Sequence, residues 1–162
     1  ESRRFRRENL YNKYFWYNQI YMTEINRKAI TVEILINAPV EKVWEDFTNA
    51  EKVKGWSFAS DDWCVGETTN DLQIGGKFKT EMKSKDGKFG FDFEGLYTDV
   101  EANKKICYEM SDGRKVEVIF EQVGVQTKLT ETFDMENENP EEMQKNGWQS
   151  ILENFKKFVE KN

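Results

Sequence analysis

The chain contains no histidine and only two cysteines among its 162 residues, and both scarcities limit the chemistry that it can perform. Without histidine there can be no Ser-His-Asp or Cys-His nucleophile system and no histidine-ligated zinc. Cys64 and Cys107 lack the Cys-x-x-Cys spacing of many metal and redox motifs. Any catalysis would therefore use carboxylate, lysine, tyrosine or cysteine side chains, and we expect no metal and no cofactor.

Long apolar runs are also missing from the sequence, and none approaches the roughly 20 residues that a membrane-spanning helix needs. The formal net charge of −6 argues against nucleic acid as a partner. The two isolated cysteines and the lack of a recognisable secretory signal lead us to expect free thiols and a cytoplasmic location.

Residues 1–21 differ in composition from the rest of the chain. They hold five Arg and Lys residues against two Glu, and seven of them are aromatic. Such a segment is typical of an arm that contacts a membrane surface or nucleic acid. We favour a simpler interpretation, in which it is an extension outside the domain, because the pattern of the domain begins only after Met22. We therefore expect one domain, over residues 22–162.

A long amphipathic helix is predicted over residues 139–162. Asn139, Pro140 and Glu142 fit an N-cap, a first-turn proline and a capping-box acid. Apolar residues then recur at the three-and-four spacing of one helical face, at Trp148, Ile151, Leu152, Phe155, Phe158 and Val159. That face needs an apolar partner, and an antiparallel sheet formed by the preceding residues is the natural one.

Period-two alternation predicts strands at 29–37, 77–83, 88–100, 105–110, 116–121 and 126–135. Asp86-Gly87 and Asp112-Gly113 are hairpin signals between them. Two short helices are predicted after the first strand, at about 40–47 and about 49–54, and Thr48 with Glu51 fits a capping box for the second. Residues 58–69 are the least regular stretch and are expected to form a surface loop.

Several segments, in this order and spacing, resemble the START-like SRPBCC superfamily. They are INAPVEKVW (36–44), IGGKF (74–78), FDFEGLY (91–97), ICYEMSDGRKVEV (106–118) and GWQSILENFKKFVE (147–160). Within the superfamily they are most similar to the group related to the carboxy-terminal domain of the activator of heat-shock-protein-90 ATPase, in its bacterial stand-alone form. The resemblance implies an α+β helix-grip fold. In that fold a curved antiparallel sheet of six or seven strands wraps around a long C-terminal helix, and two short helices follow the first strand.

The resemblance also implies a cavity between the sheet and the last helix, where members of the superfamily hold apolar molecules. The ligand-binding residues that we expect are Trp56, Trp63, Phe78, Met82, Phe91, Phe93, Glu131, Gly147 and Trp148. Gly147 lies inside the predicted helix, where its missing side chain would either admit a ligand or permit close packing against Phe91 or Phe93. Trp56 and Trp63 flank the predicted loop and are candidates for the cavity mouth.

Glu131 is the polar residue for which the sequence allows two positions, inside or outside the sheet. Alternation puts its carboxylate on the same strand face as Leu129 and Phe133. If that face lines the cavity, burial would raise the pKa of Glu131 and make it a ligand anchor or a proton-transfer group. If the face is solvated, Thr130 and Thr132 point inward instead, and we favour this more ordinary arrangement. Asp92 and Glu94 share a strand face and are expected to lie on the outside of the sheet.

Three functions remain open. The first is the binding of a small hydrophobic ligand without catalysis. The second is an enzyme of the cyclase or dehydratase kind, with Glu131, Asp92 and Tyr97 moving protons. The third is a stress-related interaction with a chaperone or another partner, which we consider doubtful. We favour the first, for a monomer or a homodimer.

Overall fold

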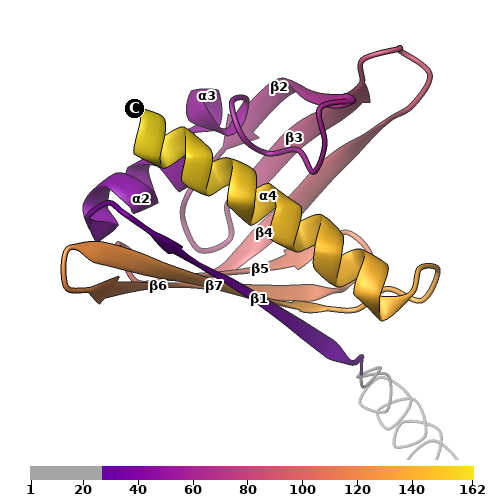
Figure 1. Cartoon of the computed structure of the whole chain (residues 1–162). Helices are drawn as coiled ribbons and strands as arrows, with labels where there is room; N and C mark the ends of the chain where they lie inside the picture. Colours follow the sequence, from indigo (N-terminus) through magenta and orange to yellow (C-terminus); the bar gives the residue numbers. More distant parts are fainter. Residues whose placement is uncertain (1–26) are drawn as a thin grey trace, which may run out of the picture.

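The computed structural model describes residues 27–162 (Figure 1). The predicted boundary between residues 21 and 22, and the basic aromatic segment before it, lie outside the described residues. The elements follow the order β1 (Ala29–Ile36), α2 (Val40–Thr48), α3 (Ala50–Val53), β2 (Trp63–Asn70), β3 (Lys77–Ser84), β4 (Gly90–Glu101), β5 (Lys105–Met110), β6 (Lys115–Val123), β7 (Gln126–Asp134) and α4 (Glu141–Lys161).

The strands form one antiparallel seven-stranded sheet in the order β1-β7-β6-β5-β4-β3-β2. Figure 1 shows α4 crossing one face of this curved sheet, with α2 and α3 near its C-terminal end. The predicted helix-grip architecture is confirmed. Gly87 and Gly113 have φ angles of 73° and 79°, which is the left-handed conformation that the two hairpin turns require.

The expected loop at residues 58–69 is wrong in its second half, because β2 begins at Trp63. This strand pairs only with β3, and its register shifts between Val65 and Thr68. The shift breaks the alternation on which recognition of a strand depends. Four consecutive half-buried residues, Trp63 to Gly66, also leave no clear apolar face in the sequence.

The core lies between the concave face of the sheet and α4. The four inward residues of β7 are Thr127, Leu129, Glu131 and Phe133, and each is buried. Leu152, Phe155 and Val159 of α4 are also buried, as the helical spacing predicted. No helix within residues 27–162 combines the length and the hydrophobicity needed to cross a bilayer.

The N-caps of two helices differ from the prediction. Helix α4 begins at Glu141, after Pro140, and the Asn139 amide bonds the Glu136 carboxylate instead of capping the helix. The N-cap of α3 is Asn49, whose side-chain oxygen accepts from the backbone N–H groups of Glu51 and Lys52. Both predictions located the helix but placed its cap one residue away.

Helix α4 also bonds the outer edge of β1. The Gln149 side-chain amide donates to the Glu33 carbonyl at 3.2 Å, and the Lys156 ammonium donates to the Leu35 carbonyl at 2.6 Å. The backbone N–H of Asn37, just after the strand, donates to the Glu160 carboxylate at 2.8 Å. These contacts join the last helix to the first strand and hold it across the sheet.

Candidate functional site

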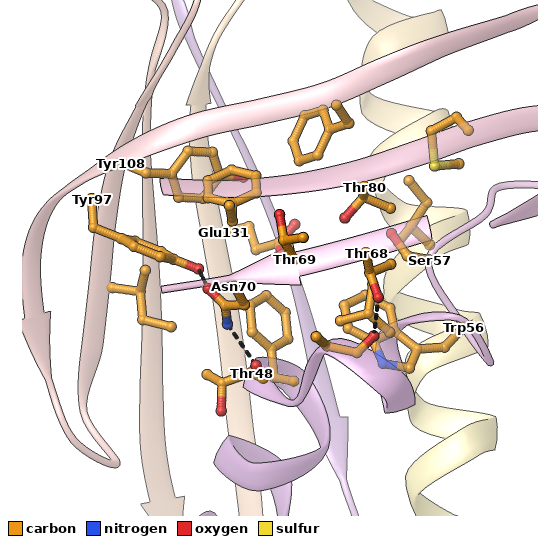
Figure 2. A pocket seen from close by; sticks show the side chains of 18 of the residues that line it. Thr48, Trp56, Ser57, Thr68, Thr69, Asn70, Thr80, Tyr97, Tyr108 and Glu131 are labelled. Atoms are coloured by element: carbon orange, nitrogen blue, oxygen red, sulfur yellow. Dashed lines mark hydrogen bonds between the residues drawn. The ribbon is translucent and has the colours of Figure 1, made fainter. Parts of the chain in front are cut away.

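A cavity of about 320 Å³ lies between the sheet and α4, with α2 and α3 along one side (Figure 2). Its volume is at the small end of ligand pockets, which span roughly 300–1,000 Å³. Strands β2 to β5 and β7 all contribute side chains to its wall. The curvature of the sheet therefore leaves space that the core side chains do not fill.

Aromatic rings form much of this wall. The Phe78 ring centroid lies 4.8 Å from that of Tyr108, 5.3 Å from that of Tyr97 and 5.7 Å from that of Phe93. Trp148 of α4 lies 6.3 Å from Phe93 and adds the helix side of the wall. These spacings are those of edge-to-face and tilted pairs, which hold the rings in defined positions and give the cavity a fixed apolar shape.

Glu131 points into this apolar space, and only 6% of it is exposed to solvent. Burial raises the pKa of its carboxyl from 4.5 to about 8, so the group is largely protonated at neutral pH. No group within residues 27–162 forms a hydrogen bond or an ion pair with it, and its oxygens are open to the cavity, because no fully enclosed side-chain oxygen there lacks a partner. The arrangement that we favoured from the sequence is wrong: Glu131 faces inward because its strand face is the buried one.

Two tyrosines line the same cavity as Glu131 (Figure 2). The Tyr97 hydroxyl donates to the Asn70 side-chain oxygen at 2.7 Å, and the Asn70 amide donates to the Thr48 carbonyl at 2.6 Å. The Tyr108 hydroxyl forms no such bond within the described part of the chain. Burial, and then the nearby Glu131 carboxyl, raise the pKa of Tyr108 well above its usual value of 10. Both phenols are therefore neutral hydrogen-bond donors.

The end of the cavity beside α2 and α3 is built around Trp56. Its indole N–H donates to the Asp46 carbonyl at 3.1 Å, and its ring stacks on that of Phe47 at 5.2 Å. Asp46 is buried and accepts from Lys42 at 2.5 Å and Lys52 at 2.7 Å. Burial alone would raise the pKa of Asp46, but the two ammonium groups outweigh it and lower that pKa.

The cavity meets solvent beside Phe91, which lines it and is 55% exposed. The Trp63 ring lies 5.7 Å from the Phe91 ring, so Trp63 supports the rim without lining the cavity. Gly147 does not line it either, and a Cβ added there would have no heavy atom within 4 Å outside its own helix. The close packing of Gly147 against Phe91 or Phe93, one of the two expected arrangements, is therefore absent.

Seven of the nine predicted ligand-binding residues line the cavity, namely Trp56, Phe78, Met82, Phe91, Phe93, Glu131 and Trp148. Asp92 does not, because it lies on the outer face and pairs with Lys79 at 2.6 Å. The sequence reasoning missed Tyr108, although Ile106, Tyr108 and Met110 alternate as the inward residues of one short strand. It also missed the polar residues of β2, which had been assigned to a loop.

No cluster of acidic and cysteine side chains suitable for a metal ion occurs within residues 27–162. The side chains that line the cavity offer apolar contact and hydrogen bonding from a few neutral groups. Arg114 is the one cationic side chain of the wall in the described chain, and its guanidinium Nε donates to the Asp112 carboxylate at 2.7 Å.

Comparison with known proteins places the chain among relatives of the same architecture. An AHSA1-like protein from Aeromonas hydrophila is 40% identical, with a TM-score of 0.78 over 83% of this chain and 93% of its own. A protein from Cytophaga hutchinsonii is 44% identical, with a TM-score of 0.72 over 82% of this chain and 92% of its own.

A protein from Chromobacterium violaceum is only 19% identical, yet has a TM-score of 0.74 over 82% of this chain and 98% of its own, and it shows the fold alone. No curated protein gives a significant match. The family model described as activator of Hsp90 ATPase homolog 1-like protein matches residues 37–160. The chain therefore belongs to this family, within the START-like SRPBCC superfamily that its sequence resembles.

Proposed function

We propose that the protein binds a small, mainly apolar molecule in the cavity between the sheet and α4, without transforming it. The observation that carries this proposal is the combination of an aromatic-lined space with a buried Glu131 carboxyl that has no partner in the described chain. No fully enclosed side-chain oxygen or nitrogen within residues 27–162 lacks a partner, so the unpaired Glu131 oxygens open onto the cavity. A bound ligand would pair with them, and the aromatic wall would bind the rest of it.

Two features support binding over catalysis. Asp92, which the enzyme hypothesis required, lies outside the cavity in an ion pair with Lys79. Tyr97 is held by Asn70, and the resulting chain of hydrogen bonds ends at a backbone carbonyl, not at a second titratable group. Glu131 is thus left without a second carboxylate to complete an acid–base pair.

The family description names an activator of a chaperone ATPase, and a role of that kind would use the surface of this protein. We propose the cavity instead because it is the feature with a defined chemistry. The free thiols Cys64 and Cys107 are compatible with the cytoplasm as the proposed setting.

Native mass spectrometry of the full chain, purified gently from its source cells, tests the proposal. We expect a defined small-molecule adduct that is released on denaturation. Thr80 lines the cavity and is buried, so Thr80→Leu should fill part of the space and remove the adduct. Thr98, exposed on β4, provides the matched control, and Thr98→Leu should keep the adduct.

An adduct that survives Thr80→Leu and is lost with a surface variant would place the binding site elsewhere. A protein that carries no adduct and also binds no member of an apolar compound panel would refute ligand binding in this cavity, and would favour a surface-mediated role with a chaperone or another protein partner.

A further inference from the structure

The chemistry at the Glu131 end of the cavity identifies the class of ligand. Glu131 on β7 and Tyr108 on β5 both point to the concave side of the sheet, and β6 lies between their strands. In the register, Val118 pairs with Glu131 and Val116 pairs with Tyr108. The two residues therefore occupy adjacent inward rows, and both side chains line the same cavity.

Their proximity has an electrostatic consequence, because the Glu131 carboxyl contributes to the raised pKa of the Tyr108 phenol. Neither group is hydrogen-bonded within residues 27–162. Two other polar residues of the lining have partners: Tyr97 donates to Asn70, and the Nε of Arg114 donates to Asp112. Glu131 and Tyr108 have none in the described chain, so both are available to a ligand.

We propose that Glu131 and Tyr108 act together as two hydrogen-bond donors to one oxygen, and that the ligand is a small neutral aromatic or alicyclic carbonyl compound. This inference rests on the proposed ligand-binding function and names its ligand class. A carbonyl oxygen has two lone pairs and no proton of its own, so it can accept from both donors at once. The aromatic wall formed by Phe78, Phe93 and Trp148 would hold the rest of the molecule.

The protonation states at neutral pH agree with this role. A carboxylic acid kept neutral in an apolar site can donate a hydrogen bond, as can a buried phenol, and such a pair is a known way to hold a carbonyl oxygen. The ionisable side chains that line the cavity are Glu131, Tyr97, Tyr108 and Arg114. The pKa values of both tyrosines are raised, and arginine remains charged, so only Glu131 changes charge between pH 6 and 9.

Four naphthalene compounds of similar size test the inference by calorimetric titration of the full chain. Acetylnaphthalene carries the carbonyl, and ethylnaphthalene has nearly the same shape without an acceptor. Naphthylmethylammonium is a cation that would prefer ionised Glu131, and naphthoate is an anion that would prefer Arg114. We expect acetylnaphthalene to bind on the order of tenfold more tightly than ethylnaphthalene at pH 7.

Two variants assign the effect to the pair. Tyr108→Phe should remove most of the preference for acetylnaphthalene and leave the affinity for ethylnaphthalene unchanged. In the parent chain the affinity for acetylnaphthalene should fall as the pH rises through about 8, because Glu131 ionises and stops donating. Glu131→Gln keeps a donor that does not titrate, so its affinity should stay constant over the same range.

Equal affinities for acetylnaphthalene and ethylnaphthalene would overturn the donor pair while leaving a ligand cavity in place. Tightest binding of naphthylmethylammonium, rising with pH, would show that Glu131 acts as an anion, and tightest binding of naphthoate would assign recognition to Arg114. Failure of all four compounds to bind would overturn this inference, and the proposed function would fall with it only if the native protein also carries no adduct.

Discussion

Phe78 and Gly95 lie opposite each other on β3 and β4, and the Phe78 ring covers the position that a side chain at residue 95 would occupy. A Cβ added to Gly95 would lie 2.7 Å from the Cε1 atom of Phe78 and 3.0 Å from the Glu109 carbonyl oxygen. The glycine therefore allows the ring to lie flat on the sheet, where it contacts Tyr97 and Tyr108 and forms part of the cavity wall.

Gly95→Ala should displace the Phe78 ring and reshape the cavity. Overpacking of this kind costs about 1–3 kcal/mol, so we expect a free energy of unfolding reduced by that amount. Urea denaturation measures the change, and the near-ultraviolet circular dichroism of the aromatic cluster should change with it. Stability equal to that of the parent chain, with an unchanged aromatic signal, would mean that Phe78 does not depend on this glycine.

Gly147→Ala should stabilise the protein, in contrast to Gly95→Ala. The position lies inside α4 and has open space around a Cβ, so the substitution removes the helical penalty of glycine without a clash. We expect the free energy of unfolding to rise by roughly 0.5–1 kcal/mol. Because Gly147 does not line the cavity, ligand affinity should remain the same. A destabilised variant would indicate a close neighbour at this face of the helix.

The buried Glu131 carboxyl should make stability depend on pH above the acid range. Its pKa is raised from 4.5 to about 8, so the folded state holds this proton more tightly than the unfolded chain does. The contribution of Glu131 to the free energy of unfolding should therefore be fully present below about pH 4.5 and should be lost as the pH rises towards 8. The loss by pH 7 is on the order of 3 kcal/mol, from the difference between the two pKa values.

Glu131→Gln isolates that contribution, since the amide has a similar shape and does not titrate. The variant should lose much less stability between pH 5 and pH 8 than the parent chain, as measured by urea denaturation at intervals across this range. Parallel pH profiles for the two proteins would show that Glu131 is not buried as a neutral acid.

Asp46 should affect the pH dependence of stability in the opposite direction to Glu131. Its pKa is lowered because Lys42 and Lys52 outweigh the effect of burial, so its stabilising effect is present above about pH 4 and is lost as the pH falls further. At pH 7 we expect Asp46→Asn to reduce the free energy of unfolding by about 1–2 kcal/mol, since both charged hydrogen bonds weaken. The deficit should shrink as the pH falls through the lowered pKa of Asp46, because the parent carboxylate is then protonated as well.

Asp92→Asn is the matched control for Asp46→Asn. Asp92 also pairs with a lysine, Lys79, but both side chains are more than 40% exposed. Exposed pairs of this kind contribute less than about 1 kcal/mol. A cost for Asp92→Asn as large as that for Asp46→Asn would show that burial does not distinguish the two ion pairs.

Alternation and helical spacing predicted much of the fold because most elements bury one face and expose the other. β7 is the clearest case, since its inward residues include Leu129 and Phe133 and its outward ones are polar. β2 could not be found in this way, because its register shifts and its first four residues are all half-buried. This segment is a strand because it pairs with β3, and a pattern within the segment itself does not show that pairing.

The polar part of the candidate site was harder to predict for a related reason. Periodicity placed Glu131 on one face of its strand but did not show whether that face is buried or exposed to solvent. Carboxylates are normally exposed, so the presence of Glu131 argued against burial of the face. Tyr108 was missed because nothing local distinguishes a tyrosine of the core from one beside a cavity. The burial of Asp46 depends on Lys52, which lies in the next helix and reaches it across the turn.

The contacts between α4 and β1 also limit how copies of this chain can associate. Addition of a foreign strand to a sheet edge requires unpaired backbone groups. At Glu33 and Leu35 the outward carbonyls already accept from Gln149 and Lys156 of the same molecule. Growth of a fibre needs an open edge at both ends of every unit, and within residues 27–162 the β1 edge is partly blocked by α4 while β2 has no such cover. Edge-to-edge association should therefore favour the β2 edge and a closed two-fold pair.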